Sequence, residues 1–237
     1  MAAEQVAGDG GLDDRVPFLA RLEAEDGTAL RELGRELTFA PRARLIHQDE
    51  PASHVLLILH GWTKVTASAA NGKEALLALR GPGDIVGESA ALTGRARSAD
   101  VTALEPVRAV AVDAERFRAF LARVPAAAFQ LLALTSDRTR AGDRRRLEFA
   151  SLSVRERLAV LLQDLARTHG RRTEEGVEVA VPLTKQELAG AVGASREMVQ
   201  RHLKELRDRG IVITGRRALV ILRPDVLRRI AQSQQEG

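Results

Sequence analysis

The stretch Leu183–Leu206, LTKQELAGAVGASREMVQRHLKEL, decides how the C-terminal part of this chain folds. Thr184 is followed three residues later by Glu187, and this spacing is a capping box that begins a helix. The apolar residues after it predict a short helix over 185–192. Gly193 then ends that helix, because glycine accepts the left-handed conformation that a sharp turn needs. The stretch therefore begins as a helix followed by a tight turn.

A second helix follows the turn. Ser195 is a preferred N-cap residue, and the spacing of apolar residues after it predicts a helix over 196–209. Short apolar runs at 211–214 and 218–222 predict a two-stranded wing. The apolar residues expected to bury the second helix are Val199, Leu203 and Leu206. The segment is thus predicted to be a winged helix-turn-helix.

The exposed edge of this second helix is rich in groups that read DNA. The first turn of a recognition helix enters the major groove, where arginine can donate to guanine O6 and N7 and glutamate can accept from cytosine N4. Other basic residues suit phosphates. The residues predicted to contact DNA are Lys185, Ser195, Arg196, Glu197, Gln200, Arg201, Lys204 and Arg216. The alternative is a protein-binding winged helix whose charges are only solvated.

The charge distribution agrees with a polyanionic partner. The whole chain of 237 residues has a net charge of only +4. Residues 152–237, however, carry 16 Lys and Arg against 11 Asp and Glu, whereas residues 1–151 carry 20 against 21. Basic segments attract nucleic acid, so the excess in the C-terminal third supports the interpretation of the helix-turn-helix without proving it.

Residues 37–112 have a different pattern. Short apolar runs alternate there with turn signals at spacings of roughly ten residues, which is typical of a sandwich, a jelly roll or a small barrel. One of these signals is Asn71-Gly72 between two apolar runs. It predicts a tight hairpin, because both central residues of such a turn need positive φ.

A long helix is predicted between the strands and the helix-turn-helix. Pro125 opens it, and the helical pattern continues to residue 150, which is long for a small domain. Its apolar residues lie on either side of a polar middle, Ser136–Arg146. This pattern favours a dimer seam or a spine between domains. The alternative is a solvated helix that lies on the β-domain.

The segment 183–206 resembles the DNA-binding motif of the cyclic-AMP receptor protein/FNR (Crp/Fnr) family of bacterial transcription regulators. Ser195-Arg196-Glu197 and Arg201 match that family's base-reading pattern, and the likeness extends over residues 35–222. The resemblance implies an α+β fold with an N-terminal cyclic-nucleotide-binding-type β-roll (jelly roll), a long dimerisation helix and a C-terminal winged helix-turn-helix. It also implies a cytoplasmic homodimer on a two-fold symmetric site in double-stranded DNA, which it bends, and contact with RNA polymerase.

Four regions follow from the pattern and the resemblance together. They are a flexible N-terminal arm (1–17), a β-roll ligand-sensing domain (18–124), the long dimerisation helix (125–150) and the winged helix-turn-helix DNA-binding domain (151–237).

A second cluster of residues is suited to a cyclic nucleotide. A guanidinium and a hydroxyl can hold its phosphate, a carboxylate can accept from its ribose hydroxyl, and glycine lets the backbone approach closely. Gly87, Glu88, Ser89, Arg97 and Ser98 supply this set and look like the family's phosphate-binding cassette. Two alternatives remain open: a Glu88–Arg97 ion pair that only closes a loop, and a β-roll that binds no nucleotide.

The predicted pocket departs from the family at the base. Members that bind cyclic AMP present a Thr-Ser pair from the long helix. Counted back from the end of that helix, the corresponding residues here are Gly142-Asp143, and the alternative is a shifted register that uses Thr135-Ser136 or Thr139. An ionised Asp143 only accepts hydrogen bonds, so it suits an amino group on adenine or guanine. Cyclic AMP is the first candidate ligand, and cyclic GMP or no nucleotide are the alternatives.

Other classes of function find little support. The absence of cysteine excludes disulfides, thiolate zinc sites and cysteine-ligated iron–sulfur clusters. The histidines lack the His-x-His pattern of a cupin metal site, so no metal is expected. No run of about 18 apolar residues exists, so no membrane span is expected. No Walker loop or Ser-His-Asp arrangement can be assembled, so the chain is not predicted to be an enzyme.

Overall fold

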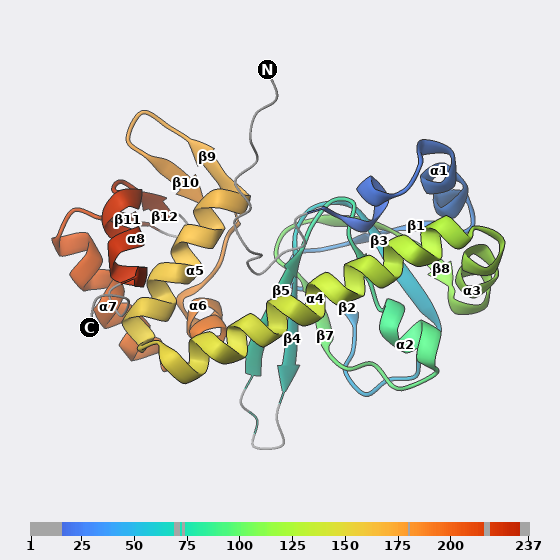
Figure 1. Cartoon of the computed structure of the whole chain (residues 1–237), viewed down its shortest axis with the longest axis horizontal. Coiled ribbons are helices and arrows are strands. Elements are labelled where there is room, and N and C mark those ends of the chain that lie inside the picture. Colours follow the sequence, from blue (N-terminus) through green and yellow to red (C-terminus); the bar gives the residue numbers. More distant parts are fainter. Residues whose placement is uncertain (1–15, 69–71, 73, 180, 216–218, 233–237) are drawn as a thin grey trace.

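The structure is a computed structural model that describes residues 16–68, 72, 74–179, 181–215 and 219–232. Two lobes lie side by side in Figure 1 and share one long helix, α4 (Pro125–Ser151). One lobe is built mainly of strands and the other mainly of helices, so the predicted α+β fold is confirmed. Of the predicted arm, residues 1–15 lie outside the described residues.

The N-terminal lobe is a β-roll made of two four-stranded sheets whose paired strands run antiparallel. The predicted hairpin is confirmed as a pairing of two neighbouring strands, although Asn71 in its turn lies outside the described residues. In one sheet the order of the strands is β1 (Arg35–Phe39), β8 (Val107–Asp113), β3 (His54–His60) and β6 (Ile85–Val86). In the other sheet the order is β2 (Arg44–Ile46), β7 (Asp100–Ala103), β4 (Thr63–Ser68) and β5 (Glu74–Arg80).

Strand β3 shows how the roll is held together. Its sequence is almost wholly apolar because both of its faces are covered. Successive side chains alternate between the faces, so Leu56 and Ile58 pack between the two sheets, while Val55 and Leu57 pack against the helices. The helices of this lobe are η1 (Phe18–Arg21), α1 (Ala24–Glu32), α2 (Glu88–Thr93) and α3 (Ala114–Arg123).

The N-terminal helix differs from its prediction. The sequence predicts one short helix after Pro17, whereas the structure has a 3-10 turn, η1, followed by a separate helix, α1. The two are divided because Leu22 is extended, with ψ 154°. Phe18 is fully buried in the core next to α3 and α4, so the break lets this side chain reach the core.

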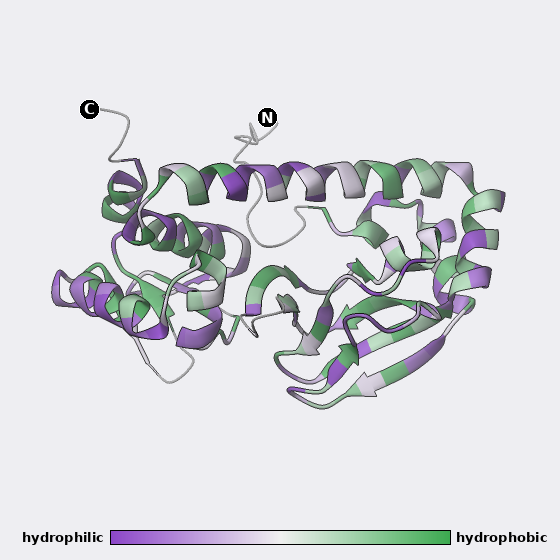
Figure 2. Ribbon diagram, turned by 90° about the horizontal axis from the view of Figure 1, so that it is seen from below, coloured by the Kyte–Doolittle hydropathy of each residue, from purple (hydrophilic) through white to green (hydrophobic). Residues whose placement is uncertain are grey.

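Helix α4 lies along one edge of the molecule, with both lobes on the same side of it (Figure 2). It is 27 residues long, which confirms the predicted long helix and extends it to Ser151. Only Leu152 and Ser153 separate α4 from the next helix. Among the described residues no single helix is long and apolar enough to cross a membrane; α3 and α4 meet that test only as a pair bent by 112°.

The C-terminal lobe is a winged helix-turn-helix, as predicted. The structure adds two elements that the sequence reasoning did not assign, a strand in the charged segment after His169 and a helix after the wing. The elements are α5 (Val154–His169), β9 (Gly170–Arg172), β10 (Val177–Val179), α6 (Lys185–Val192), α7 (Arg196–Asp208), β11 (Val212–Thr214), β12 (Leu219–Ile221) and α8 (Pro224–Gln232).

The two lobes share a hydrophobic core. Leu76 and Leu79 of β5 and Leu104 after β7 belong to the same buried cluster as the apolar residues of α5, α6 and α7. At its edge, Trp62 stacks edge-on against His169, with 4.3 Å between the ring centroids. The C-terminal lobe is therefore docked on the β4–β5 hairpin of the β-roll.

Candidate ligand pocket and nucleic-acid interface

A cavity opens inside the β-roll where the predicted cassette meets α4. It has a volume of about 480 Å³, counted together with the open space at its mouth. Its lining residues are Ile46, Val65, Arg80, Val86, Gly87, Glu88, Ser89, Ala90, Arg97, Ser98, Ala99, Val101 and Arg138. The structure thus brings together five of the six residues that were predicted to hold the ligand.

Glu88 forms an ion pair with a residue that the sequence analysis did not select. Its Oε1 accepts a 2.7 Å hydrogen bond from Arg138 Nη1 on α4. A second nitrogen of the same guanidinium, Nη2, donates to the Ile85 carbonyl at 2.9 Å. The alternative in which Glu88 pairs with Arg97 to close a loop is therefore replaced by a contact between the cassette and the long helix.

Arg97 is almost fully buried and is held by backbone carbonyls. Its Nη1 donates to the Gly87 carbonyl at 2.7 Å, and its Nη2 donates to the carbonyl of His54. Burial lowers the pKa of Arg97, and the nearby carboxylates of Glu88 and Glu50 raise it. The guanidinium is thus fixed in position with its charge retained, as a phosphate partner should be.

Gly87 is required at the start of the cassette for two reasons. Its φ is 83°, which favours glycine, and an added Cβ would lie 2.4 Å from Arg97 Nη1. The hydroxyl-bearing residues Ser89 and Ser98 line the cavity and are exposed. The cavity therefore offers hydroxyls at its mouth, a carboxylate, and buried guanidinium groups deeper inside. That set suits a small phosphorylated ligand.

Asp143 lies outside the cavity of its own chain. It is exposed on α4 and pairs with Arg146, with 2.8 Å between Oδ1 and Nη1. Arg138 occupies the inner face of α4 instead, because a helix turns by about 100° per residue and five residues carry the chain to the other side. Asp143 stays a predicted ligand contact that this single chain does not form.

The helix-turn-helix has the local geometry that its sequence predicts. Glu187 Oε2 accepts from the Thr184 amide at 2.7 Å, and the Thr184 hydroxyl accepts from the Glu187 amide at 3.2 Å, so the capping box is confirmed. Gly193 has φ 61°, and the hydroxyl of Ser195 accepts from the amide of Met198 at 3.2 Å. These contacts fix the start of α7 relative to α6.

The predicted base-reading edge of α7 faces solvent. The residues on it, all exposed, are Arg196, Glu197, Gln200, Arg201 and Lys204. Hydrogen bonds from its own backbone amide and from Ser195 lower the pKa of Glu197, so this carboxylate is ionised and can accept from a base. Lys185 at the start of α6 is half-buried, and Arg216 lies outside the described residues.

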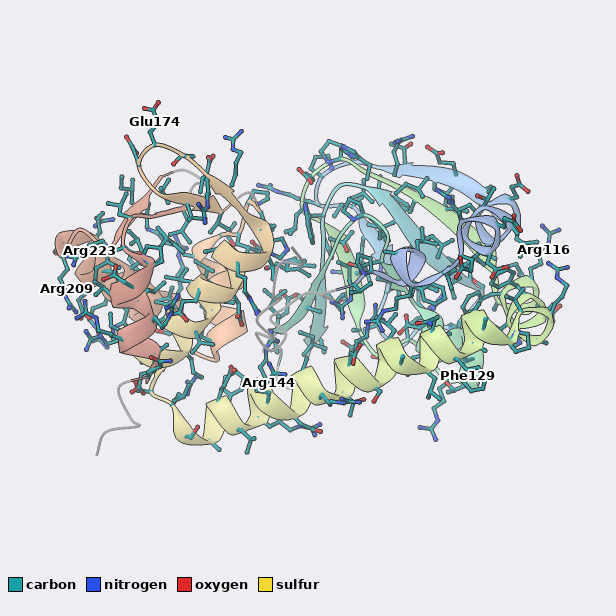
Figure 3. The ribbon with its side chains drawn as sticks, turned by 45° about the horizontal axis from the view of Figure 1, so that its top comes forward. Arg116, Phe129, Arg144, Glu174, Arg209 and Arg223 are labelled. Atoms are coloured by element: carbon teal, nitrogen blue, oxygen red, sulfur yellow. The ribbon has the colours of Figure 1, made fainter. Side chains whose placement is uncertain are left out.

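The described part of the chain contains no cluster of three or more His, Asp or Glu side chains that could hold a metal ion. Arg209 and Arg223 extend the basic surface of this lobe, and Figure 3 shows both of them at the end remote from the β-roll. The two candidate sites, the cavity and the α7 edge, thus lie in different lobes that α4 connects.

Comparison with known proteins agrees with this division. The cyclic nucleotide-binding domain family matches residues 36–124, and the Crp-like helix-turn-helix domain family matches residues 156–230. The chain is 31% identical over 182 residues to the CRP-like cAMP-activated global transcriptional regulator of Mycobacterium tuberculosis, which covers 76% of this chain and 81% of that relative. It is also 31% identical over 215 residues to the cyclic AMP receptor protein of Thermus thermophilus, covering 86% and 94%.

Solved structures show the same fold. The c-di-GMP responsive global regulator CLP of Xanthomonas campestris matches with a TM-score of 0.76 and 21% identity, over 84% of this chain and 99% of that one. The catabolite activator protein of Thermus thermophilus matches with a TM-score of 0.52 and 27% identity, over 92% and 99%. With a β-roll that matches the cyclic nucleotide-binding domain family, a long helix and a C-terminal domain that matches the Crp-like helix-turn-helix family, this chain belongs to the Crp/Fnr family of bacterial transcription regulators.

Proposed function

We propose that this chain is a homodimeric, sequence-specific DNA-binding regulator whose affinity for DNA is set by a cyclic nucleotide bound in the β-roll. The observation that carries the proposal is the position of α4. This helix supplies Arg138 to the cavity at one point and leads directly into the DNA-binding lobe at its end. The proposed regions are the arm (1–17), the sensing domain (18–124), the dimerisation helix (125–150) and the DNA-binding domain (151–237).

The ligand is held by contacts that follow from its chemistry. Arg97 and the hydroxyl of Ser98 bind the phosphate, with Ser89 beside them, because a charge-assisted hydrogen bond to an anion is the strongest contact available there. Glu88 accepts from the ribose hydroxyl while it stays paired with Arg138. Cyclic AMP is named for several relatives and c-di-GMP for one of the structural neighbours, so cyclic AMP is the first ligand to test.

Dimerisation is supported by the outer face of α4. Phe129 is 71% exposed, Leu132 64% and Leu147 68%, which is unusual for three large apolar residues on one helix. Their spacing puts them on one side of the helix, opposite Arg138. Figure 3 marks Phe129 on this part of α4, and in Figure 2 the other described helices and strands all lie on one side of α4. A second copy that packs along this face would bury the apolar residues.

Asp143 lies on the same outer side of α4 as Leu132 and Leu147. In the proposed dimer it lies at the seam, within reach of the space between the two cavities. This explains how Asp143 can contact a ligand although it does not line the cavity of its own chain. The carboxylate would accept from an amino group of the base.

The α7 edge reads the DNA in this proposal. Arg196, Glu197 and Arg201 contact base edges in the major groove, while Lys204 and Lys185 contact phosphates. Two copies of α7 then meet two half-sites one helical turn apart. The ligand acts by favouring the arrangement of the dimer in which the two α7 helices fit that spacing. Such a regulator works in the cytoplasm beside RNA polymerase.

The experiment is a DNA-binding selection coupled to calorimetry. Purified full-length protein is incubated with a randomised duplex library, with and without cyclic AMP or cyclic GMP, and the bound DNA is sequenced. The proposal expects a two-fold symmetric consensus whose recovery depends on the nucleotide, and calorimetric binding of at least one of the two. A consensus that is recovered equally without nucleotide, combined with no heat of binding, would instead support a regulator that acts without nucleotide or with another effector.

A further inference from the structure

The N-terminal segment 16–21 lies against the turn that leads into the cassette. The Leu19 amide donates to the Gly83 carbonyl at 2.9 Å. A Cβ added at Gly83 would lie 2.9 Å from the Cβ of Pro17, so Pro17 packs closely on this turn. Gly83 stands two residues before β6, and β6 leads directly to Gly87. The segment is thus attached to the part of the roll from which the cassette begins.

The same segment is also attached to α4. Phe18 is fully buried in one cluster with apolar residues of α3 and α4. Arg21 Nη2 donates to Asp137 Oδ2 of α4 at 2.7 Å, and Arg21 Nε donates to the Val16 carbonyl at 2.9 Å. The side chain of Arg21 is 12% exposed and that of Asp137 is 53% exposed. The segment 16–21 therefore joins the roll to α4 through one apolar side chain and one ion pair.

This ion pair lies next to the contact between α4 and the cavity. Asp137 immediately precedes Arg138 in α4. The Arg138 guanidinium donates to Glu88 Oε1 at 2.7 Å and to the Ile85 carbonyl at 2.9 Å. Consecutive residues of a helix point about 100° apart, so Asp137 and Arg138 leave α4 in different directions, one toward η1 and the other toward the cassette. A rotation of α4 about its own axis would stretch at least one of these contacts.

We infer that Arg21 is a positioning residue for the ligand pocket. Through Asp137 it holds α4 in the rotation that places Arg138 in the cavity, although Arg21 itself does not line that cavity. The inference rests on the proposed function and adds a residue outside the pocket to it. A hydrogen bond between two ionised groups is strong and directional. Without it α4 is freer to turn, so part of the binding energy of the nucleotide is used to order the helix.

The test combines calorimetry of the full-length protein, with cyclic AMP and cyclic GMP, and fluorescence anisotropy of a labelled duplex. Arg21→Met keeps an apolar stem but removes the guanidinium, and Asp137→Asn removes the charge at the other end of the pair. Each variant should bind the nucleotide that the wild type prefers about 2- to 5-fold more weakly, the range for one ion pair near the surface. The affinity for the duplex without nucleotide should stay the same, whereas general damage to the fold would lower both affinities.

Three further variants identify the pair as the cause. The double variant Arg21→Met/Asp137→Asn should lose no more nucleotide affinity than either single variant, because both substitutions remove the same contact. Arg21→Lys keeps a positive charge opposite Asp137 and should recover most of the loss. Arg108→Met breaks an exposed 2.9 Å pair with Glu36, between β8 and β1, and should leave the nucleotide affinity unchanged. Thermal unfolding confirms that each variant is folded, and Asp137→Asn alone still tests the pair if Arg21→Met is not.

The outcomes separate the inference from the proposed function. Wild-type nucleotide affinity in both Arg21→Met and Asp137→Asn would overturn the inference and leave the proposed function intact. A loss in Arg21→Met that Asp137→Asn does not share would also overturn it, because Arg21 would then act without Asp137. If the wild type binds neither nucleotide, the proposed function fails before any variant is compared, and the inference fails with it.

Discussion

Arg138 on α4 and Glu88 in the cassette are joined by a 2.7 Å hydrogen bond between Nη1 and Oε1. The side chains are 17% and 9% exposed, so the pair is largely shielded from solvent. Helix α4 also leads to the DNA-binding lobe. A ligand that changes the hydrogen bonds of Glu88 therefore changes the contact that holds Arg138, and with it α4, against the cassette. The pair is thus a direct physical connection between the cassette and α4.

Glu88→Gln should weaken both ligand binding and its effect on DNA. The substitution removes the charge that holds Arg138 and weakens the acceptor for the ribose hydroxyl. Loss of such a charged hydrogen bond should lower nucleotide affinity roughly 10- to 100-fold. Calorimetry measures the affinity, and fluorescence anisotropy of a labelled duplex measures the gain in DNA binding on adding nucleotide. Glu115→Gln, an exposed glutamate on α3, is the control. An unchanged gain in Glu88→Gln would rule out this route of coupling.

Phe129→Glu and Leu147→Glu should convert the dimer to monomers. Each places a carboxylate in the apolar seam, where burial of an unpaired charge costs several kcal/mol. Light scattering coupled to size-exclusion chromatography measures the mass. Ile213→Glu changes an exposed apolar residue of the wing and should leave the mass unchanged. A wild type that is monomeric at micromolar concentration would contradict the proposed role of α4.

Glu187 stabilises the docked lobes in two ways at once. Its Oε2 accepts from Thr184 in the capping box, and its Oε1 lies 3.0 Å from Lys64 Nζ on β4. Lys64→Ala removes this ion pair together with the longer one to Glu74 (3.7 Å), leaves the capping box in place, and should lower the free energy of unfolding by about 0–1 kcal/mol. Glu187→Ala also removes the half of the capping box in which Oε2 accepts from the Thr184 amide, and should cost about 0.5–1.5 kcal/mol more. Urea unfolding of both variants checks this order, and equal losses would mean that the cap contributes nothing.

His169 should make stability depend on pH in the acidic range. Burial lowers the pKa of His169 to about 4, from an ordinary value of 6.5. Between these values the unfolded chain binds a proton that the folded chain does not, so this contribution is complete above pH 6.5 and is lost as the pH falls toward 4. The fluorescence of Trp62, which stacks on His169, reports the unfolding. His169→Phe keeps an aromatic ring and should reduce the loss of stability between pH 6.5 and 4. If the wild type and His169→Phe lose the same free energy of unfolding between pH 6.5 and 4, His169 is not the source of this pH dependence.

Local features of the fold could be predicted from the sequence. The caps at Thr184 and Ser195 each involve residues three positions apart, so their hydrogen bonds are encoded in a short stretch. The cassette residues were also predicted together, because most of them lie within one segment. Helix α8 could also be predicted from its sequence, because Pro224 stands at its start and Val226, Leu227 and Ile230 follow at helical spacing.

Contacts between distant segments could not be predicted in this way. Arg138 and Glu88 are separated by 50 residues, and a basic residue in a polar stretch of helix gives no indication of its partner. Strand β9 has no apolar alternation and forms because it can pair with β10.

The most direct measurement compares Arg201→Ala with Arg209→Ala on selected and scrambled duplexes. Both arginines are exposed, one on the predicted reading edge of α7 and the other just after its C-terminal end. Arg201→Ala should weaken binding to the selected site by about 1–3 kcal/mol and leave binding to scrambled DNA nearly unchanged, whereas Arg209→Ala should preserve the ratio. If Arg201→Ala keeps the full preference for the selected site, α7 does not read DNA through this edge.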